Sequence, residues 1–363
     1  MPLSLFPKDR YVGIDIGHST ITIAQVERSG SSCRIVALGV EPTPEGSVNS
    51  GVVTDATAVG TAIRHAMRSA HISANVANLA VSGGTVVVRT VKMPKMPEDA
   101  LRKSIRFEAG RYVPSSVEDS YIECEMLGER EDGQMEVLVA ASPKDMVESK
   151  IAAAGHAGLD VEVVDVEAFA LYRALLEHDS QFDPETTVAL VDCGAESTDV
   201  SVIDRGVFAL TRSIPIGGNS LTTALESYFK LSPHEAEEGK RSLNLAPLTS
   251  GAPMENAPLR VIQPLIDELV REIRRSLNYY QSQNSDQPGG GKVERLVIVG
   301  GGSLLGGLPE YFGSKLGLEV SSPSFLENPK FHFDGTEPPM DPRALAIAVG
   351  LGMRRAGRQL AVA

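Results

Sequence analysis

The sequence has 363 residues, 42% of them apolar and 22% charged, and its formal net charge at pH 7 is −13. This length favours two or more domains with separate cores, and the acidic balance argues against nucleic acid as a ligand. The sequence has no apolar run long enough to span a membrane, and no P-loop, HExxH or GxSxG motif. Three cysteines without a CxxC spacing, and a start without a secretory core, predict a cytosolic protein with reduced thiols.

The first elements along the chain are predicted to form a β-hairpin. Residues 11–26 (YVGIDIGHSTITIAQV) contain an apolar strand that ends in Asp15-x-Gly17, a short polar turn with Ser-Thr, and an alternating strand. The elements expected next are a strand over residues 33–42 and a helix over residues 54–70, with Thr54 or Asp55 as its N-cap.

A β-α-β-β-α-β unit is predicted for residues 83–164 and the strand that they lead into. Its first helix carries apolar residues at helical spacing, so that one face should be buried. That face comprises Leu101, Ile105, Ala109 and Tyr112. The elements in order are a strand at 85–93, a helix at 98–113, strands around 121–127 and 135–141, a helix at 143–158 and a strand at 161–166.

The hairpin recurs in the second half of the chain. Residues 188–203 (VALVDCGAESTDVSVI) repeat the apolar strand, the turn and the alternating strand, with Asp192 and Gly194 in the places of Asp15 and Gly17. The repeat predicts two related α/β halves. A strand at 206–217 and a helix at 218–230 follow, with Asn219 or Ser220 as the expected cap.

The two turns have the composition of a site for phosphate and magnesium. A glycine at the third position lets the backbone turn sharply and lets a ligand approach closely. The following hydroxyls and backbone amides can donate to an anion. An aspartate at the strand end suits hydrated Mg²⁺, which prefers oxygen ligands and keeps its waters. One such turn alone is more often an ordinary hairpin, but two matched copies predict a clasp for a polyphosphate with Mg²⁺.

A glycine triplet follows a buried strand late in the chain. Residues 296–299 lead into Gly300-Gly301-Gly302-Ser303, and a helix is expected over 308–316. The triplet permits close approach of a flat or anionic group, to which the helix N-terminus adds a positive dipole end. A tight strand–helix turn without a ligand would have the same sequence. The other elements expected here are a long helix at 256–283 and a last helix that begins at Asp341-Pro342.

The order of these elements resembles the actin-like ATPase superfamily, in which two such hairpins grip the phosphates and a late glycine loop holds adenosine. Within it, the sequence is most similar to the PilM family of type IV pilus assembly, itself similar to FtsA. The similarity runs from about residue 5 to residue 354. The segments that carry it are LFPKDRYVGIDIGHSTITIAQ, KSIRFEAGRYVPSSVED, GLDVEVVDVEAFALYRAL, TRSIPIGGNSLT, LVREIRRSLNYYQ, VIVGGGSLLGGLPEYF and DPRALAIAVGLGMR.

The resemblance implies a binding site for ATP and Mg²⁺. Glu167, at the start of a connecting helix, would orient the attacking water, and Glu237 with Lys240 would touch the ribose. Asp15 and Asp192 would face the metal. The remaining residues implied for nucleotide binding are Gly17, His18, Ser19, Thr20, Gly194, Ala195, Ser197, Thr198, Gly300, Gly301, Gly302 and Ser303.

Three residues depart from the family pattern. His18 replaces a small hydroxyl residue, Glu196 places an acid inside the second turn, and Gly239 weakens the ribose helix by about 1 kcal/mol relative to alanine. Each departure argues against efficient turnover, so slow ATP hydrolysis is the most that the sequence predicts.

The expected fold is α/β and actin-like, with two related halves around a nucleotide cleft and an inserted β-α-β-β-α-β subdomain in the first half. FtsA and PilM also carry an insertion at this place. The expected boundaries are 8–82, 165–187 and a C-terminal helix at 341–358 for the first half, 83–164 for the inserted subdomain, and 188–340 for the second half, with an upper helical part at about 220–285.

Residues 89–111 form a locally basic stretch, with seven Lys or Arg against three acids. A solvated cationic face is the ordinary explanation; a docking surface for a partner peptide or an acidic membrane is the functional one. PilM relatives bind the N-terminal cytoplasmic tail of the membrane protein PilN beside this subdomain. The resemblance therefore implies Arg89, Arg102 and Arg106 as partner-binding residues, and a location on the inner face of the inner membrane through that partner.

The function predicted from the sequence is a nucleotide-dependent cytoplasmic adaptor of type IV pilus assembly, with PilN-like and other assembly proteins as partners and with self-association left open. Two alternatives remain at this stage. A sugar-kinase-like enzyme would need a carboxylate base in a substrate loop, and no clear candidate is found. An FtsA-like filament protein would carry an amphipathic C-terminal helix, for which the final residues GMRRAGRQLAVA are too short and weakly patterned.

Overall fold

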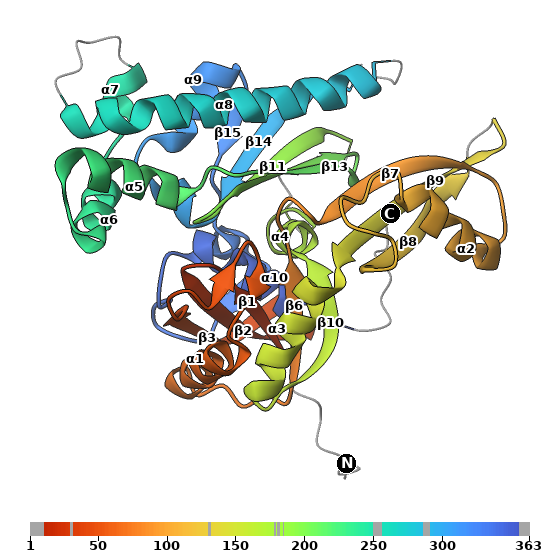
Figure 1. Cartoon of the computed structure of the whole chain (residues 1–363), viewed down its shortest axis with the longest axis horizontal. Helices are drawn as coiled ribbons and strands as arrows, with labels where there is room; N and C mark the ends of the chain where they lie inside the picture. The colour runs from red at the N-terminus through yellow and green to blue at the C-terminus, as the bar shows by residue number, and fades with distance from the viewer. Residues whose placement is uncertain are drawn as a thin grey trace. The chain divides into compact units, whose positions relative to one another are not determined.

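The computed structural model describes residues 11–29, 32–129, 132–177, 179, 182–183, 185–249, 256–285 and 291–355. The chain forms two compact units (Figure 1). The first comprises Met1–Val81, Asp145–Asp179 and Ser324–Gln359, and the second comprises Ser82–Lys144, Ser180–Pro323 and Leu360–Ala363. Within the described part of the chain, no helix combines the length and the hydropathy needed to cross a bilayer.

A six-stranded sheet forms the centre of the first unit. Its strands are β1 (Tyr11–Ile16), β2 (Thr20–Ser29), β3 (Ser32–Pro42), β6 (Val76–Val81), β10 (Asp160–Val166) and β16 (Phe331–Phe333). Their order across the sheet is β10–β6–β1–β2–β3–β16. A small separate hairpin is made by β4 (Val48–Asn49) and β5 (Val52–Val53). The helices are α1 (Ala56–Ser69), α3 (Lys144–His156), α4 (Glu167–Leu175) and α10 (Ala346–Gly352).

Helices cover both faces of this sheet. Successive residues of β1 point to opposite faces, so that its side chains show which helices lie on which side. Ile14 and Ile16 share a core with residues of α1 and α3. Gly13 faces α10, since a β-carbon at Gly13 would lie 2.1 Å from the Ala348 carbonyl oxygen. The alternation therefore points Asp15 to the same side as α10 and its neighbour α4.

An eight-stranded sheet forms the centre of the second unit. Its strands are β7 (Val87–Pro94), β8 (Ser120–Glu129), β9 (Gln134–Pro143), β11 (Thr187–Cys193), β12 (Thr198–Asp204), β13 (Val207–Ile214), β14 (Arg295–Val299) and β15 (Glu319–Ser321). Their order is β15–β14–β11–β12–β13–β7–β9–β8. The helices are α2 (Glu98–Ala109), α5 (Gly218–Phe229), α6 (Pro233–Arg241), α7 (Ala246–Thr249), α8 (Ala257–Gln283) and α9 (Leu308–Leu316).

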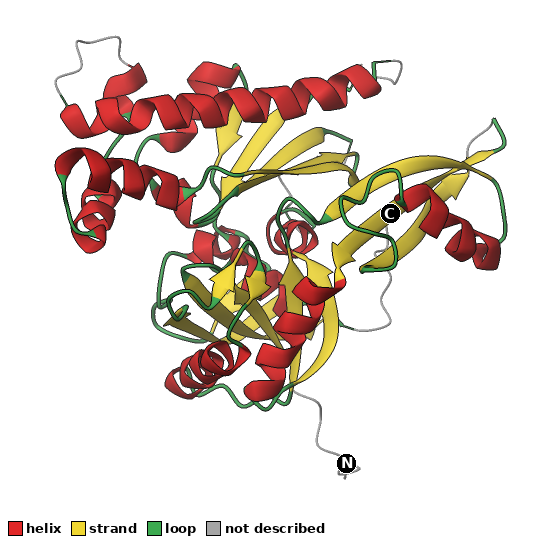
Figure 2. Ribbon diagram, in the orientation of Figure 1, coloured by secondary structure: helices red, strands yellow, loops and turns green. Residues whose placement is uncertain are grey.

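The long helix α8 runs along the helical layer of the second unit (Figure 2). It contacts α5 and α9 and packs across β12 and β13. Asn256 caps it by accepting a hydrogen bond from the Leu259 amide at 3.0 Å. Its buried stripe includes Ile262, Ile266 and Ile273, which belong to the core of the second unit.

The two sheets repeat one five-stranded pattern, β10–β6–β1–β2–β3 in the first unit and β15–β14–β11–β12–β13 in the second. In both, the first three strands are parallel and the next two antiparallel. The hairpin register is also the same, with Asp15 opposite Thr22 and Asp192 opposite Asp199. The structure thus confirms the predicted α/β class and the predicted duplication.

The inserted segment is smaller than predicted and joins a different sheet. Strands β7, β8 and β9 with α2 form a subdomain whose core contains Leu101, Ile105 and Ala109, as expected. Its sheet continues that of the second unit, because β7 pairs with β13 between Arg89 and Leu210. Helix α3 and strand β10 instead belong to the first unit, where β10 lies parallel to β6. The segment is therefore not a closed β-α-β-β-α-β unit, and it does not lie in the first half.

Three other boundaries differ from expectation. Residues 324–340 belong to the first unit, because β16 pairs with β3. Asp55 caps α1 as predicted, with its carboxylate 2.9 Å from the Ala58 amide. The N-cap of α5 is Gly217 and not Asn219 or Ser220, although the Ser220 hydroxyl takes part by accepting a hydrogen bond from the Gly217 amide at 3.4 Å. Asp341 caps a 3₁₀ turn that precedes α10. The predicted end of the last helix at residue 358 lies outside the described residues.

Candidate functional site

The first Asp-x-Gly turn is closed by a backbone hydrogen bond from the Gly17 amide to the Thr20 carbonyl, 3.1 Å long. A β-carbon at Gly17 would lie 2.8 Å from that carbonyl oxygen, so that the tight turn requires glycine. Thr43, just beyond β3, fixes the turn from outside. Its hydroxyl donates to the Gly17 carbonyl at 2.8 Å and its amide to the Ser19 carbonyl at 3.1 Å.

The second turn has the same geometry. The Gly194 amide donates to the Ser197 carbonyl at 2.9 Å, and a β-carbon at Gly194 would lie 2.9 Å from that oxygen. The start of α5 supports this turn, since the Gly218 amide donates to the Gly194 carbonyl at 3.0 Å. The Asn219 amide donates to the Ala195 carbonyl at 2.8 Å. These bonds explain the cap of α5, because its first amides are satisfied by the turn and need no side chain.

Other predicted turn residues have structural contacts of their own. The Thr198 hydroxyl is buried and donates to the Ile216 carbonyl at 2.8 Å. Ser19 is exposed at the tip of the first turn, while His18, Thr20, Ala195 and Ser197 are partly exposed. The turn tips therefore present accessible groups, whereas the buried Thr198 hydroxyl serves the fold.

The glycine triplet lies against the second aspartate. Gly300 has φ 82° and ψ 170°, a conformation that is essentially restricted to glycine. A β-carbon there would lie 2.2 Å from Asp192 Oδ1, and one at Gly302 would lie 2.9 Å from the Cys193 carbonyl oxygen. Gly301 differs from both, because its β-carbon would meet no atom within 4 Å. The Ser303 hydroxyl is committed to the Gly300 carbonyl at 2.7 Å, so Gly301 is the member of the triplet open to a ligand.

The predicted ribose residues form a network between α5 and α6. Lys240 Nζ donates to Glu237 Oε2 at 2.6 Å, to the Thr222 hydroxyl at 2.9 Å and to the Gly218 carbonyl at 3.2 Å. Burial opposes ionisation of Glu237, but the hydrogen bonds from Lys240 and Thr222 outweigh it and lower the pKa of that carboxyl. Both predicted residues thus lie beside the start of α5, where they stabilise the segment that holds the second turn.

An apolar recess opens next to these groups, within the second unit. Its walls come from the second turn, the start of α5, one face of α8 and the segment after the triplet, and most of its surface is apolar. Sequence reasoning did not identify it, because its walls come together only through tertiary packing. The lining residues are Cys193, Gly194, Thr198, Ile216, Gly217, Gly218, Leu221, Leu265, Ile266, Leu269, Gly302, Leu305 and Leu308.

Asp15 and Glu167 come together in the first unit, and a residue that the sequence analysis missed lies with them. Lys150 Nζ is 3.9 Å from Glu167 Oε1, and the lysine side chain is only 2% exposed. Burial, and then the neighbouring Glu167 carboxylate, raise the pKa of Asp15 to about 7, while the Lys150 ammonium acts in the opposite direction. The signal in the sequence was a lysine inside the apolar stripe of α3, which also contains Met146 and Ala153.

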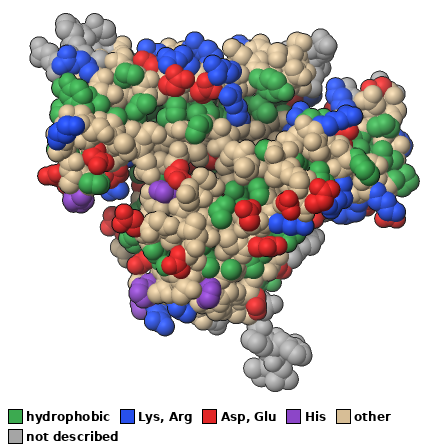
Figure 3. All heavy atoms as spheres, viewed as in Figure 1, with side chains coloured by type: hydrophobic (Ala, Val, Ile, Leu, Met, Phe, Trp, Pro, Cys, Tyr) green, Lys and Arg blue, Asp and Glu red, His purple; other side chains and the backbone are tan. Residues whose placement is uncertain are grey.

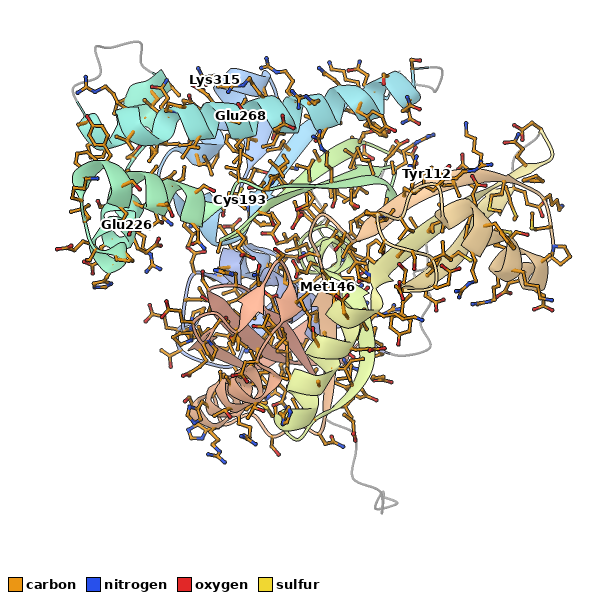
Figure 4. All side chains as sticks on the ribbon, in the orientation of Figure 1. Tyr112, Met146, Cys193, Glu226, Glu268 and Lys315 are labelled. Atoms are coloured by element: carbon orange, nitrogen blue, oxygen red, sulfur yellow. The ribbon has the colours of Figure 1, made fainter. Side chains whose placement is uncertain are left out.

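The predicted partner residues lie on the small subdomain. The Arg89 guanidinium stacks 3.9 Å above the ring centroid of Tyr112 (labelled in Figure 4). Arg102 pairs with Glu98 at 3.0 Å, and Arg106 is exposed on the same helix. Phe107, next to it, is 86% exposed. The space-filling view shows Lys and Arg side chains gathered on this subdomain as well as along α8 (Figure 3).

Comparison with known proteins agrees with this architecture. The family model of the type IV pilus assembly protein PilM matches residues 13–356. A chain in the solved PilM–PilN type IV pilus biogenesis complex superposes with a TM-score of 0.82 at 26% identity, covering 95% of this chain and 98% of that one. MreB 5 of Spiroplasma citri, solved with AMPPNP, shares the fold with a TM-score of 0.53 at 14% identity and 95% coverage of both chains.

The cell division protein FtsA of Streptococcus pneumoniae is 23% identical over 368 aligned positions, which span 88% of this chain and 78% of FtsA. The predicted relation to FtsA is therefore present at low identity. Because the PilM family model extends over nearly the whole described chain, and the fold repeats that of a solved PilM, the chain belongs to the PilM family of type IV pilus assembly proteins.

Proposed function

We propose that this chain is an ATP-binding adaptor of type IV pilus assembly, which binds the cytoplasmic tail of a PilN-like protein on the inner face of the inner membrane. The observation that carries the nucleotide part is the pair of Asp-x-Gly turns, which match in hydrogen bonding and in register. The partner part is supported by the PilM–PilN complex of the similar solved chain.

The donor set suits a nucleotide with Mg²⁺. Asp15 and Asp192 are carboxylates at strand ends, where each can hold a water of the metal. Bound Mg²⁺ would neutralise phosphate charge. The accessible turn tips would donate to phosphate oxygens, and the open side of Gly301 would admit a flat base. Glu167 would orient the attacking water, with slow hydrolysis as the upper limit of its activity.

Titration of a fluorescent ATP analogue tests the nucleotide part. Asp15→Ala and Asp192→Ala should each weaken binding in Mg²⁺ by about tenfold or more, the loss expected for one charge-assisted contact of ~1.5–3 kcal/mol. Glu27→Ala is the matched control, because Glu27 is an exposed carboxylate on the same hairpin, far from the turn, where it pairs with Arg34. Unchanged affinity in both aspartate variants would remove the two-turn site.

Binding of the partner's tail tests the adaptor part. We expect Arg102→Glu with Arg106→Glu to weaken binding of a peptide from the N-terminal tail of a PilN-like protein, because charge reversal changes the basic face of α2. ATP affinity should not change. Arg271→Glu with Arg275→Glu is the control, since it makes the same i,i+4 reversal on the exposed face of α8, where Arg271 and Arg275 are 60% and 67% exposed. Equal tail binding by both double variants would move the docking surface away from α2.

A further inference from the structure

Lys150 is buried at a position where the fold alone does not require a charge. It lies on the buried stripe of α3 together with Met146, Val147, Ala153 and Ala154, and Figure 4 labels Met146 on this helix. Removing an ammonium group from water is costly, and an apolar side chain of similar volume at such a site is often equally or more stabilising. The lysine therefore calls for an explanation beyond packing.

The ammonium group is fixed at one point of the sheet. Lys150 Nζ donates to the Ala80 carbonyl at 2.7 Å, near the end of β6. Since β6 is parallel to β1, the carboxyl ends of both strands lie on the same side of the sheet. Ala80 is therefore at the end of the sheet where Asp15 stands and where the first turn begins. One of the three ammonium hydrogens is used by Ala80, and Glu167 Oε1 lies within 3.9 Å of the same nitrogen.

In the part of the chain that the structure describes, Glu167 forms its ion pair with Lys150. It is the first residue of α4, whose N-cap, Val166, offers no side-chain hydrogen bond. A second carboxylate, Asp15, stands near the end of β1, the strand that pairs in parallel with β6, which carries Ala80. Two neighbouring carboxylates repel each other, and a bound proton or a nearby cation relieves the repulsion. Lys150 is a cation that the chain itself supplies there.

We propose that Lys150 is the positioning residue of Glu167: its ammonium, anchored on the Ala80 carbonyl, holds the Glu167 carboxylate in place beside Asp15 and balances the charge of the pair. The role of Glu167 toward water rests on the proposed function, but the cluster exists in the nucleotide-free chain. A direct consequence follows. Without Lys150, the two carboxylates form a site that a divalent cation would stabilise even in the absence of nucleotide.

A double-mutant cycle in the full-length, nucleotide-free chain tests this. The variants are Lys150→Met, Glu167→Gln and the double variant, with Lys144→Met on the same helix as the control. Lys150→Met should lower the melting temperature by about 5 °C or more, and by clearly less when Glu167 is already Gln. Addition of 5 mM MgCl₂, as a probe without nucleotide, should raise the melting temperature of Lys150→Met but not that of the wild type or of the double variant.

The melting experiments give a different result if Lys150 only fills space in the core. In that case Lys150→Met costs the same in both backgrounds, or stabilises the chain, and MgCl₂ has no selective effect; either outcome overturns the proposal. Where the wild type cleaves ATP in a single turnover, Lys150→Met should slow cleavage by the same factor as Glu167→Gln, without further loss in the double variant and with the nucleotide Kd changed less than threefold. If the wild type binds no ATP, the proposed function fails, while the melting cycle still decides the role of Lys150.

Discussion

Gly300 and Gly301 are neighbours in one turn, yet alanine should affect them in opposite ways. At Gly300 the backbone has φ 82° and ψ 170°, which costs a residue with a β-carbon about 1–3 kcal/mol. The added carbon would also lie 2.2 Å from Asp192 Oδ1 and 2.7 Å from the Cys193 carbonyl oxygen. Relieving such overlap in a packed region costs about another 1–3 kcal/mol. Gly300→Ala should therefore reduce the free energy of unfolding by about 2–6 kcal/mol.

Gly301→Ala is the matched comparison, because its β-carbon would meet no atom within 4 Å. We expect it to change the free energy of unfolding by less than about 0.5 kcal/mol, as for an unconstrained surface position. Urea denaturation of both variants, followed by circular dichroism, measures the difference. ATP titration adds a second contrast, since Gly301→Ala should weaken binding of the base while leaving the fold intact. Equal stability of the two variants would refute the close approach of the triplet to Asp192.

Three further predictions concern the first unit. Glu167→Gln should lower ATP hydrolysis by at least about tenfold with nucleotide affinity unchanged, because a water-orienting group acts in the transition state; a parallel loss of affinity would assign Glu167 to binding. Gly350→Ala should lower the free energy of unfolding by at least about 1–3 kcal/mol, because its β-carbon would lie 1.9 Å from the Ala170 carbonyl oxygen, whereas Gly155→Ala on α3 meets nothing and should not destabilise. The Arg343 hydrogen bond lowers the pKa of Asp341 below its ordinary value of 3.8, so ionised Asp341 stabilises the fold above that pH. The stability difference between the wild type and Asp341→Asn should then be constant near neutral pH and shrink as the pH falls below about 3.8.

Local patterns in the sequence were sufficient for the two hairpins. Asp15-x-Gly17 and Asp192-x-Gly194 end apolar strands and are followed by alternating ones, and hairpin pairing is set by neighbouring residues. The same holds for the buried face of α2 around Leu101 and Ile105. The predicted fold and family depended on these motifs, and the family model and the solved PilM chain confirm both.

The missed features depend on contacts between distant segments. Residues 143–166 have the pattern of a helix and a strand that could close a local unit, but β10 pairs with β6, about eighty residues earlier in the chain. That pairing places α3 against the first sheet and buries Lys150. Likewise, Gly217 caps α5 because the Ala195 carbonyl accepts the Asn219 amide, a contact that no local propensity encodes. The pairing of Lys150 with Glu167 therefore becomes visible only once the order of the strands in the first sheet is known.

The attachment of the small subdomain has a mechanical consequence. Up to residue 355, the last one described, the chain passes between the two units after Val81, Lys144, Asp179 and Pro323. Hydrogen bonds between β7 and β13 join the subdomain to the sheet of the second unit. The Thr90 hydroxyl donates to the Phe208 carbonyl at 2.8 Å, and the Val88 amide donates to the Thr211 hydroxyl at 3.2 Å. A force applied to α2 would therefore divide between the sheet that carries Asp192 and the two chain connections to the first unit, at Val81 and Lys144.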